Sequence, residues 1–144
     1  MPNKKDFVKN KIADLEIREK DLKHFKLYIE TWKRSLNSRM EENVLLKNML
    51  SDILKNNYNQ NSLEEIEEFQ NKFISEDELI ISLRKDVNDL DNLLSAKMFG
   101  DGKIEKSFNS KMENLQNDIT KSTNRFRILK SVFNDFQHKN IRPA

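Results

Sequence analysis

The chain has 144 residues, which is long enough to bury a hydrophobic core within one domain. It contains no cysteine, which excludes disulfides and thiolate metal sites, and its formal net charge is only +2. Hydrophobic residues make up 36% and charged residues 35% of the chain, a balance typical of long helices with narrow apolar stripes.

No targeting or membrane segment is evident. The N-terminal residues carry charges without the apolar core of a secretory signal. No apolar run approaches the ~20 residues that cross a bilayer as a helix. We therefore expect a soluble, cytoplasmic protein without contact to a membrane.

The first predicted helix covers about residues 4–57. Its apolar residues form two rows with a spacing of seven, the second row three residues behind the first. These rows are Val8, Leu15, Leu22, Ile29, Leu36 and Leu50, and Phe25, Trp32, Leu46 and Ile53. They are the a and d positions of heptads, which bury a seam against neighbouring helices. Asn43 fills the gap in the first row, where it either fixes the packing register or marks a solvated interruption.

An asparagine-rich stretch at residues 56–62 separates the first helix from a second at about residues 62–98. Ser62 and Glu65 form a capping box at the start of this second helix. A third helix is predicted at about residues 103–139. The apolar stripes of these two helices are Ile66, Phe69, Phe73, Ile80, Leu83, Val87, Leu90 and Leu94, then Phe108, Met112, Leu115, Ile119, Phe126, Leu129, Phe133 and Phe136. No segment alternates with period two, so we expect no strand.

Two internal patterns resemble further helix starts, Ser38 with Glu41 and Ser75 with Glu78. The apolar stripe keeps its phase through both sites, and neither glycine nor proline lies nearby. We predict continuous helices, and leave open a kink at either site.

The distribution of charge favours antiparallel packing of the three helices. Residues 1–57 carry 13 basic and 9 acidic side chains, residues 62–98 carry 4 and 10, and residues 103–144 carry 9 and 4. An acidic helix between two basic ones is complementary, and short loops make consecutive helices neighbours. The predicted fold is all-α, an elongated antiparallel three-helix bundle with coiled-coil-like heptad packing, forming a single domain over residues 1–144.

The only two glycines lie in the motif GDGK at residues 100–103. A phosphate-binding loop needs four residues between its glycines and a Ser or Thr after the lysine, and this motif has neither. An EF-hand would need further carboxylates at fixed offsets. We interpret the motif as a turn, with Gly100 ending the second helix and Asp101 capping the third.

Sites for metals or covalent catalysis lack support in the sequence. His24 and His138 each follow an aspartate by three residues, but both occupy heptad position c, outside the seam. They also belong near opposite ends of the bundle. There is no cysteine nucleophile and no GxSxG motif. We expect no metal, no cofactor and no enzymatic activity.

Nucleic-acid binding is the main alternative function. Residues 121–130 combine four basic residues with an aromatic one, Phe126. However, Phe126 lies on the core stripe and Arg125 lies at its edge, so neither is placed to stack on a base. A net charge of +2 is also small for a dedicated binder. A basic helical accessory factor that contacts nucleic acid therefore remains the second hypothesis.

The first helix is predicted to be longer than the other two, so that residues 1–20 overhang the bundle. Four apolar residues continue the stripe there, namely Phe7, Val8, Ile12 and Leu15. An unpaired apolar stripe favours association with a partner, and we expect a symmetric homodimer. The alternative is a frayed terminus, since Lys11 and Arg18 occupy d positions. The first hypothesis for function is thus a non-enzymatic helical scaffold or adaptor, acting through self-association and an unknown protein partner.

Overall fold

The computed structural model describes the backbone of residues 4–56, 62–98 and 105–140, and the side chains of residues 22–56, 62–96 and 108–139. The described chain forms helix α1 (Lys4–Asn56), helix α2 (Leu63–Met98) and helix α3 (Glu105–Asn140). Within these residues there is no strand. The predicted all-α fold with three long helices is confirmed. Each helix boundary lies within two residues of its predicted position.

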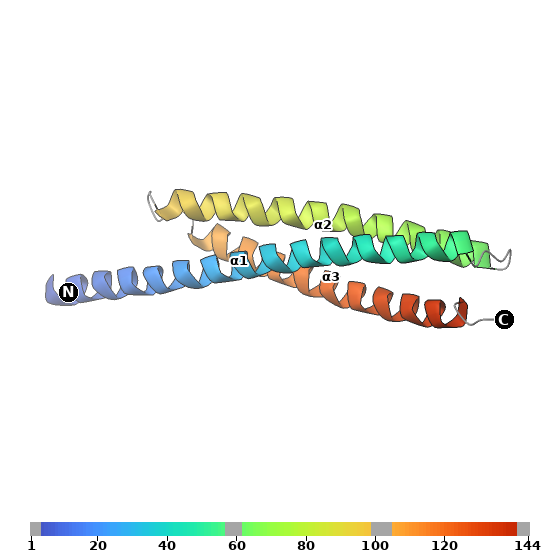
Figure 1. Cartoon of the computed structure of the whole chain (residues 1–144). Coiled ribbons are helices and arrows are strands. Elements are labelled where there is room, and N and C mark those ends of the chain that lie inside the picture. Colours follow the sequence, from blue (N-terminus) through green and yellow to red (C-terminus); the bar gives the residue numbers. More distant parts are fainter. Residues whose placement is uncertain (1–3, 57–61, 99–104, 141–144) are drawn as a thin grey trace.

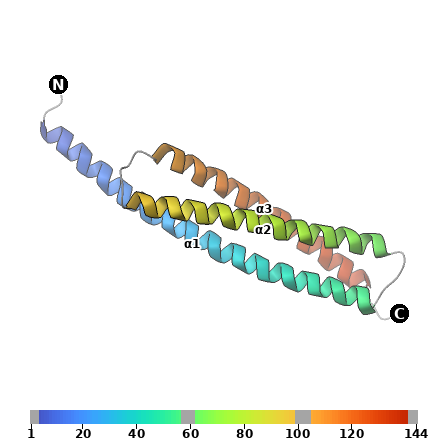
Figure 2. The same ribbon diagram turned by 90° about the horizontal axis from the view of Figure 1, so that it is seen from above.

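The three helices form an elongated antiparallel bundle (Figure 1). Helix α2 runs back along α1, and the two lie side by side in both ribbon views (Figures 1 and 2). Helix α3 returns along α2 and crosses the α1–α2 pair obliquely. Both α1 and α2 are uninterrupted, so the predicted continuity through Ser38 and Ser75 is confirmed.

The heptad stripes are the buried faces of the helices. From Ile29 onward every predicted stripe residue is buried except Leu46, which is half-buried like Leu22 and Phe25. Burial of this kind contributes about 1.5–3 kcal/mol per large side chain, which is why the seam rather than helix propensity stabilises the bundle.

The buried side chains form two clusters along the bundle. The first contains Ile29, Trp32, Leu36, Leu83, Val87, Leu90, Leu94, Phe108, Met112, Leu115 and Ile119. The second contains Leu50, Ile53, Ile66, Phe69, Phe73, Phe126, Leu129, Phe133 and Phe136. Phenylalanine dominates the second cluster, where Phe73 and Phe133 meet edge to face with ring centroids 5.1 Å apart. Both clusters draw on all three helices, so the core is shared along the bundle.

Charges at the helix ends fit the helix dipole. Helix α2 follows Ser62 and has Glu64 and Glu65 in its first turn. Helix α1 has Lys55 in its last turn, and α3 has His138 and Lys139. Acidic residues at the amino ends and basic residues at the carboxyl ends stabilise helices. The GDGK turn predicted at residues 100–103 lies outside the described residues.

The helices differ in length. Helix α1 has 53 residues, whereas α2 and α3 have 36 each. The surplus lies at the N-terminal end, where the first turns of α1 extend beyond the end of α2 and the start of α3 (Figures 1 and 2). We refer to residues 4–20 of α1 as the overhang.

Candidate interaction surfaces and a buried polar layer

A layer of polar side chains separates the two apolar clusters. Arg39, Asn43, Glu76 and Ser122 are the buried polar residues, each with at most 5% of its surface exposed. Arg39, Glu76 and Ser122 occupy equivalent positions in the stripes of α1, α2 and α3. All three helices therefore replace an apolar residue at one level of the bundle, and we call this level the polar layer.

Arg39 joins α1 to α3 through both ends of its guanidinium group. One terminal nitrogen donates to Ser122 Oγ at 2.7 Å and the other to Thr123 Oγ1 at 2.6 Å. Both hydroxyls in turn donate to the carbonyl oxygen of Ile119. The guanidinium carbon also lies 5.8 Å from the ring centroid of Phe126. The planar guanidinium group presents two terminal nitrogens at a fixed spacing, which suits Arg39 to two neighbouring hydroxyls on one helix.

Asn43 joins α1 to α2. Its Nδ2 donates to the carbonyl oxygen of Phe73 at 3.0 Å and to Asp77 Oδ1 at 2.7 Å. Lys47 pairs with the other oxygen of Asp77. Asn43 is fully buried, so the alternative of a solvated gap is wrong. These bonds form at one alignment of α1 on α2, as expected of a residue that fixes register.

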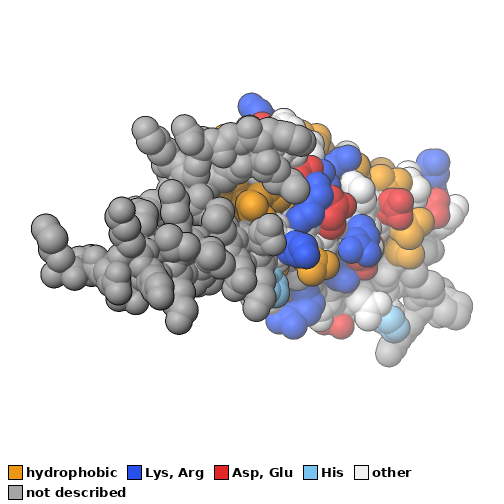
Figure 3. Space-filling view, turned by 90° about the vertical axis from the view of Figure 1, so that its left-hand side faces the viewer, with side chains coloured by type: hydrophobic (Ala, Val, Ile, Leu, Met, Phe, Trp, Pro, Cys, Tyr) orange, Lys and Arg blue, Asp and Glu red, His pale blue; other side chains and the backbone are white. Residues whose placement is uncertain are grey.

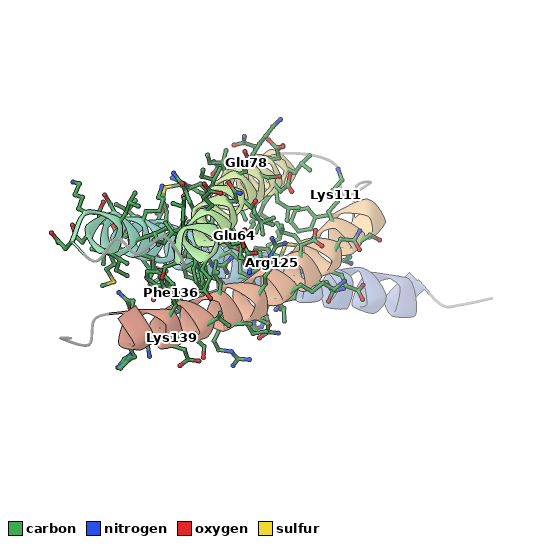
Figure 4. The ribbon with its side chains drawn as sticks, turned by 90° about the vertical axis from the view of Figure 1, so that its right-hand side faces the viewer. Glu64, Glu78, Lys111, Arg125, Phe136 and Lys139 are labelled. Carbon is green, nitrogen blue, oxygen red and sulfur yellow. The ribbon has the colours of Figure 1, made fainter. Side chains whose placement is uncertain are left out.

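Glu76 is the least compensated member of the polar layer. Its exposed fraction is 1%, and neither carboxylate oxygen has a hydrogen-bond partner. The closest opposite charge is Arg125, whose Nε lies 3.5 Å from Oε1 (Arg125 is labelled in Figure 4). Burial raises the pKa of Glu76, while the charges of Arg125 and Arg39 oppose that shift and Asp77 adds to it. The carboxylate is therefore held between helices at a cost in stability.

Two open grooves lie between α2 and α3, on either side of the polar layer. The first, of about 290 Å³, is lined by residues 86–93 of α2 and 111–118 of α3, and we call it the 86–118 groove. The second, of about 280 Å³, is lined by residues 65–72 and 132–139, and we call it the 65–139 groove. Figure 4 labels Lys111 at the first groove and Phe136 and Lys139 at the second.

The two grooves differ in charge. Among the residues that line the 86–118 groove, Asp86, Asp89 and Asp118 face one lysine, Lys111. The 65–139 groove has three acidic and two basic lining residues. Its apolar floor includes Phe69 and Phe136, whereas that of the 86–118 groove consists of leucines. The 86–118 groove is thus the more acidic surface.

Other large apolar side chains are exposed on all three helices, some of them one turn apart, such as Leu45 with Met49 and Ile128 with Val132. The large exposed ones are Leu27, Tyr28, Val44, Leu45, Met49, Leu54, Ile74, Ile81, Ile128 and Val132. In the end view of Figure 3, hydrophobic side chains of the described part lie among charged ones. Exposed apolar residues, singly or in such small groups, are common on protein surfaces.

The four predicted self-association residues are Phe7, Val8, Ile12 and Leu15. Their backbone belongs to α1 and to the overhang. Their side chains lie outside the described residues. The structure therefore places the backbone of this stripe at the end of the bundle, and the contacts of its side chains are not described.

The remaining candidates from the sequence are placed as follows. His24 and His138 are both exposed, and His138 Nδ1 lies 2.8 Å from the carbonyl oxygen of Asn134. In the part of the chain that the structure describes, no group of three or more His, Asp or Glu side chains is arranged to hold a metal ion. No described helix is long and apolar enough to cross a membrane.

The basic segment 121–130 contributes to the bundle itself. Phe126 is buried in the second apolar cluster, so it cannot stack on a nucleobase. Lys130 Nζ lies 2.8 Å from Glu42 Oε1 on α1, and Arg125 approaches Glu76 on α2. The expected position of Phe126 in the core is confirmed. The expected position of Arg125 at the edge of the core is confirmed as well.

The sequence interpretation missed the polar layer as a unit. It identified Asn43 but named none of Arg39, Glu76 and Ser122, which leave gaps in the three stripes. The signal was present, because each gap falls at a d position and the predicted antiparallel arrangement brings the three to one level.

No protein-family model matches the chain, and no curated protein or solved structure is similar to it. The geometry of the chain itself therefore carries the functional argument.

Proposed function

We propose that the protein is a non-enzymatic helical scaffold or adaptor that self-associates through the overhang of α1. The observation that carries this proposal is the difference in helix length. Helix α1 extends beyond α2 and α3 at one end (Figure 1), and its sequence there continues the apolar stripe. A helix that protrudes from a bundle with an apolar stripe is suited to pair with another helix.

The free energy gained by burying the apolar stripe can be compared with the free-energy cost of association. Burying four large apolar side chains contributes about 6–12 kcal/mol gross per chain. Association costs about 4–15 kcal/mol in lost freedom of motion. The stripe alone therefore supports a weak contact, and a stable dimer needs the overhang to bury a second surface as well.

The test is a comparison of the full chain with a variant lacking residues 2–20, by light scattering across a dilution series. The full chain is expected to show the mass of a dimer at high concentration, and the shortened chain that of a monomer throughout. The shortened chain keeps every residue of both core clusters, so it is expected to fold. Equal masses for both versions at every concentration would rule out the overhang as the interface.

A further inference from the structure

Lysines of α1 pair with aspartates of α2 along one edge of the seam between these helices. Lys33 contacts Asp91, and Lys47 contacts Asp77. The two pairs are fourteen residues apart on both helices and in opposite order, as expected of antiparallel helices. A contact midway between them, seven residues from each pair, therefore belongs to the same edge of the seam.

The midway contact joins Arg84 of α2 to Met40 of α1 and contains no acid. A terminal nitrogen of Arg84 donates to Met40 Sδ at 3.3 Å. A thioether sulfur is a weak acceptor and carries no charge. Arg84 is half-buried, and in the part of the chain that the structure describes no carboxylate lies within ion-pair distance of it. The positive charge of Arg84 is thus unmatched in a row where the lysines are matched.

A pocket of about 120 Å³ opens beside Arg84, between α1 and α2. Its lining consists of Lys33, Leu36, Asn37, Arg84, Val87 and Asn88, and we call it the 33–88 pocket. Leu36 and Val87 belong to the first apolar cluster and form its floor. The other four side chains all carry N–H donors, and none of the lining residues is acidic. The pocket therefore offers donors and an unmatched positive charge.

Two asparagines extend the donors of the pocket to both helices. Asn37 belongs to α1, and Asn88 belongs to α2, one turn from Arg84. Both side chains are exposed, and neither has a hydrogen-bond partner among the described residues. An anion in the pocket can therefore accept hydrogen bonds from α1 and from α2.

These donors favour a tetrahedral oxyanion over a planar one. The guanidinium group of Arg84 is a planar fork of donors that matches two oxygens of a carboxylate or of a phosphate. A carboxylate has no oxygen beyond those two. A phosphate group has further oxygens, which remain to accept from the amides of Asn37 and Asn88.

We infer that the 33–88 pocket binds phosphate, as the free ion or as the phosphate group of a small molecule, with Arg84 as its main ligand. The bound anion takes the place of the acid that the row of ion pairs lacks at this position. Because it contacts α1 and α2 together, its binding stabilises the pairing of these helices. The site contains no residue of the overhang, so the inference goes beyond the proposed function and can fail or hold without it.

A titration with sodium phosphate, followed by nitrogen–proton NMR of the side chains, tests the inference. The Nε–H signal of Arg84 and the amide signals of Asn37 and Asn88 are expected to shift along one saturating curve. The expected dissociation constant is on the order of 1 mM. Sodium chloride at equal ionic strength is the reference, because it reproduces the screening of charge. A titration without saturable shifts beyond those in chloride would overturn the inference.

Two variants of matched charge test the role of Arg84. Arg84→Met removes the charge and keeps a long side chain beside Met40, and it is expected to raise the dissociation constant for phosphate at least about tenfold. Lys85→Met removes the same charge from the next residue, which is exposed and does not line the pocket. This control is expected to bind phosphate like the wild type. Equal weakening by both variants would mean that phosphate responds only to net charge, and the inference would fail.

A third variant supplies the missing acid. Asn88→Asp places a carboxylate one turn from Arg84, so it is expected to occupy the guanidinium group and to abolish the saturable response to phosphate. Phosphate binding by this variant as tight as that of the wild type would overturn the inference.

Titrations of the wild type with glycerol phosphate and with acetate identify the class of anion. Tighter binding of glycerol phosphate than of inorganic phosphate assigns the pocket to a phosphate monoester, and the reverse order assigns it to the free ion. Acetate is expected to bind at least about tenfold more weakly than either. Acetate binding as tight as that of phosphate would contradict the assignment of the pocket to phosphate.

Discussion

At the scale of single residues, burial affects the two charges of the polar layer differently. Arg39 gives two hydrogen bonds to hydroxyls, which compensate for its removal from water. Glu76 has no hydrogen bond, although it is the more deeply buried of the two. Buried charges stabilise a fold only when their hydrogen-bonding capacity is met. Arg39 is therefore expected to stabilise the bundle and Glu76 to destabilise it at neutral pH.

The first prediction is that Glu76→Gln raises the melting temperature at pH 7. Burial raises the pKa of Glu76 in the folded state, so the stability contributed by protonation of this side chain is fully present below the unfolded pKa. That contribution is lost as the pH rises through the folded pKa. Glutamine cannot ionise, so the variant is expected to gain about 1 kcal/mol, or roughly 2–4 °C, at neutral pH.

The gain is expected to vanish in acid, where the wild-type side chain is protonated as well. Thermal unfolding followed by circular dichroism from pH 3 to pH 8 measures both limits. Glu78→Gln is the control, because Glu78 is exposed on the same helix (Figure 4) and its substitution is expected to change little. A variant Glu76→Gln less stable than wild type at pH 7 would show that the ion pair with Arg125 outweighs burial.

The second prediction concerns Arg39. Arg39→Ala removes both hydroxyl contacts and leaves Glu76 with less compensating charge, so it is expected to destabilise the bundle by about 3–5 kcal/mol. Arg34→Ala, at an exposed position of the same helix, is expected to change the stability by less than about 0.5 kcal/mol. Chemical denaturation of the two variants measures the difference, and similar midpoints would contradict the assigned role of Arg39.

At the scale of the helices, α1 and α2 are joined by ion pairs beside the apolar seam. Lys26 and Lys33 of α1 both contact Asp91 of α2, and Lys47 contacts Asp77. These pairs realise the predicted attraction between a basic first helix and an acidic second one. They are partly exposed, so each contributes little on its own, but together they favour antiparallel alignment at one register.

The third prediction is that Asp91→Asn weakens the α1–α2 contact in a pH-dependent way. The hydrogen bond from Lys33 is the main cause that lowers the pKa of Asp91. The resulting stability is present above the unfolded pKa and lost as the pH falls through the folded pKa. The variant is expected to lose about 0.5–1 kcal/mol at pH 7 and to equal the wild type in strong acid.

Urea denaturation at both pH values tests this prediction. Asp52→Asn, at an exposed position near the end of α1, is the control. A loss of stability for Asp91→Asn that is as large in strong acid as at pH 7 would mean that the ion pairs are not its cause.

Much of the fold could be predicted from the sequence because the heptad pattern is nearly unbroken. The spacing of Ile29, Leu36 and Leu50 specifies which face of α1 is buried, and the scarcity of glycine and proline limits where helices end. The polar layer is harder to predict, since a gap such as Glu76 in one stripe looks like a solvated position. Only the alignment of three gaps across three helices shows that the residue is buried.

The candidate surfaces were predictable to different degrees. The overhang follows from helix lengths alone, since every helical residue adds the same rise. The 86–118 groove could not be predicted, because it depends on how far apart α2 and α3 pack along their outer edge. Asp86 and Asp118 lie on different helices, and their spacing in the sequence gives no indication that they line one surface.

At the scale of the whole molecule, the bundle has two unlike ends. At one end α1 extends beyond its neighbours as the overhang, and the opposite end carries the C-terminal part of α3 (Figure 1). A molecule with two unlike ends suits the proposed role of a scaffold, because association at one end leaves the other end available to a further partner.

The central claim, that the stripe of the overhang is the self-association surface, is tested most directly by sedimentation equilibrium on two double variants. I12D/L15D places charges within the stripe, and L45D/M49D places the same charges on exposed apolar residues of α1 far from the overhang. We predict that I12D/L15D sediments as a monomer at concentrations where L45D/M49D and the wild type are dimers. A dimer of I12D/L15D as stable as that of the wild type would contradict the claim.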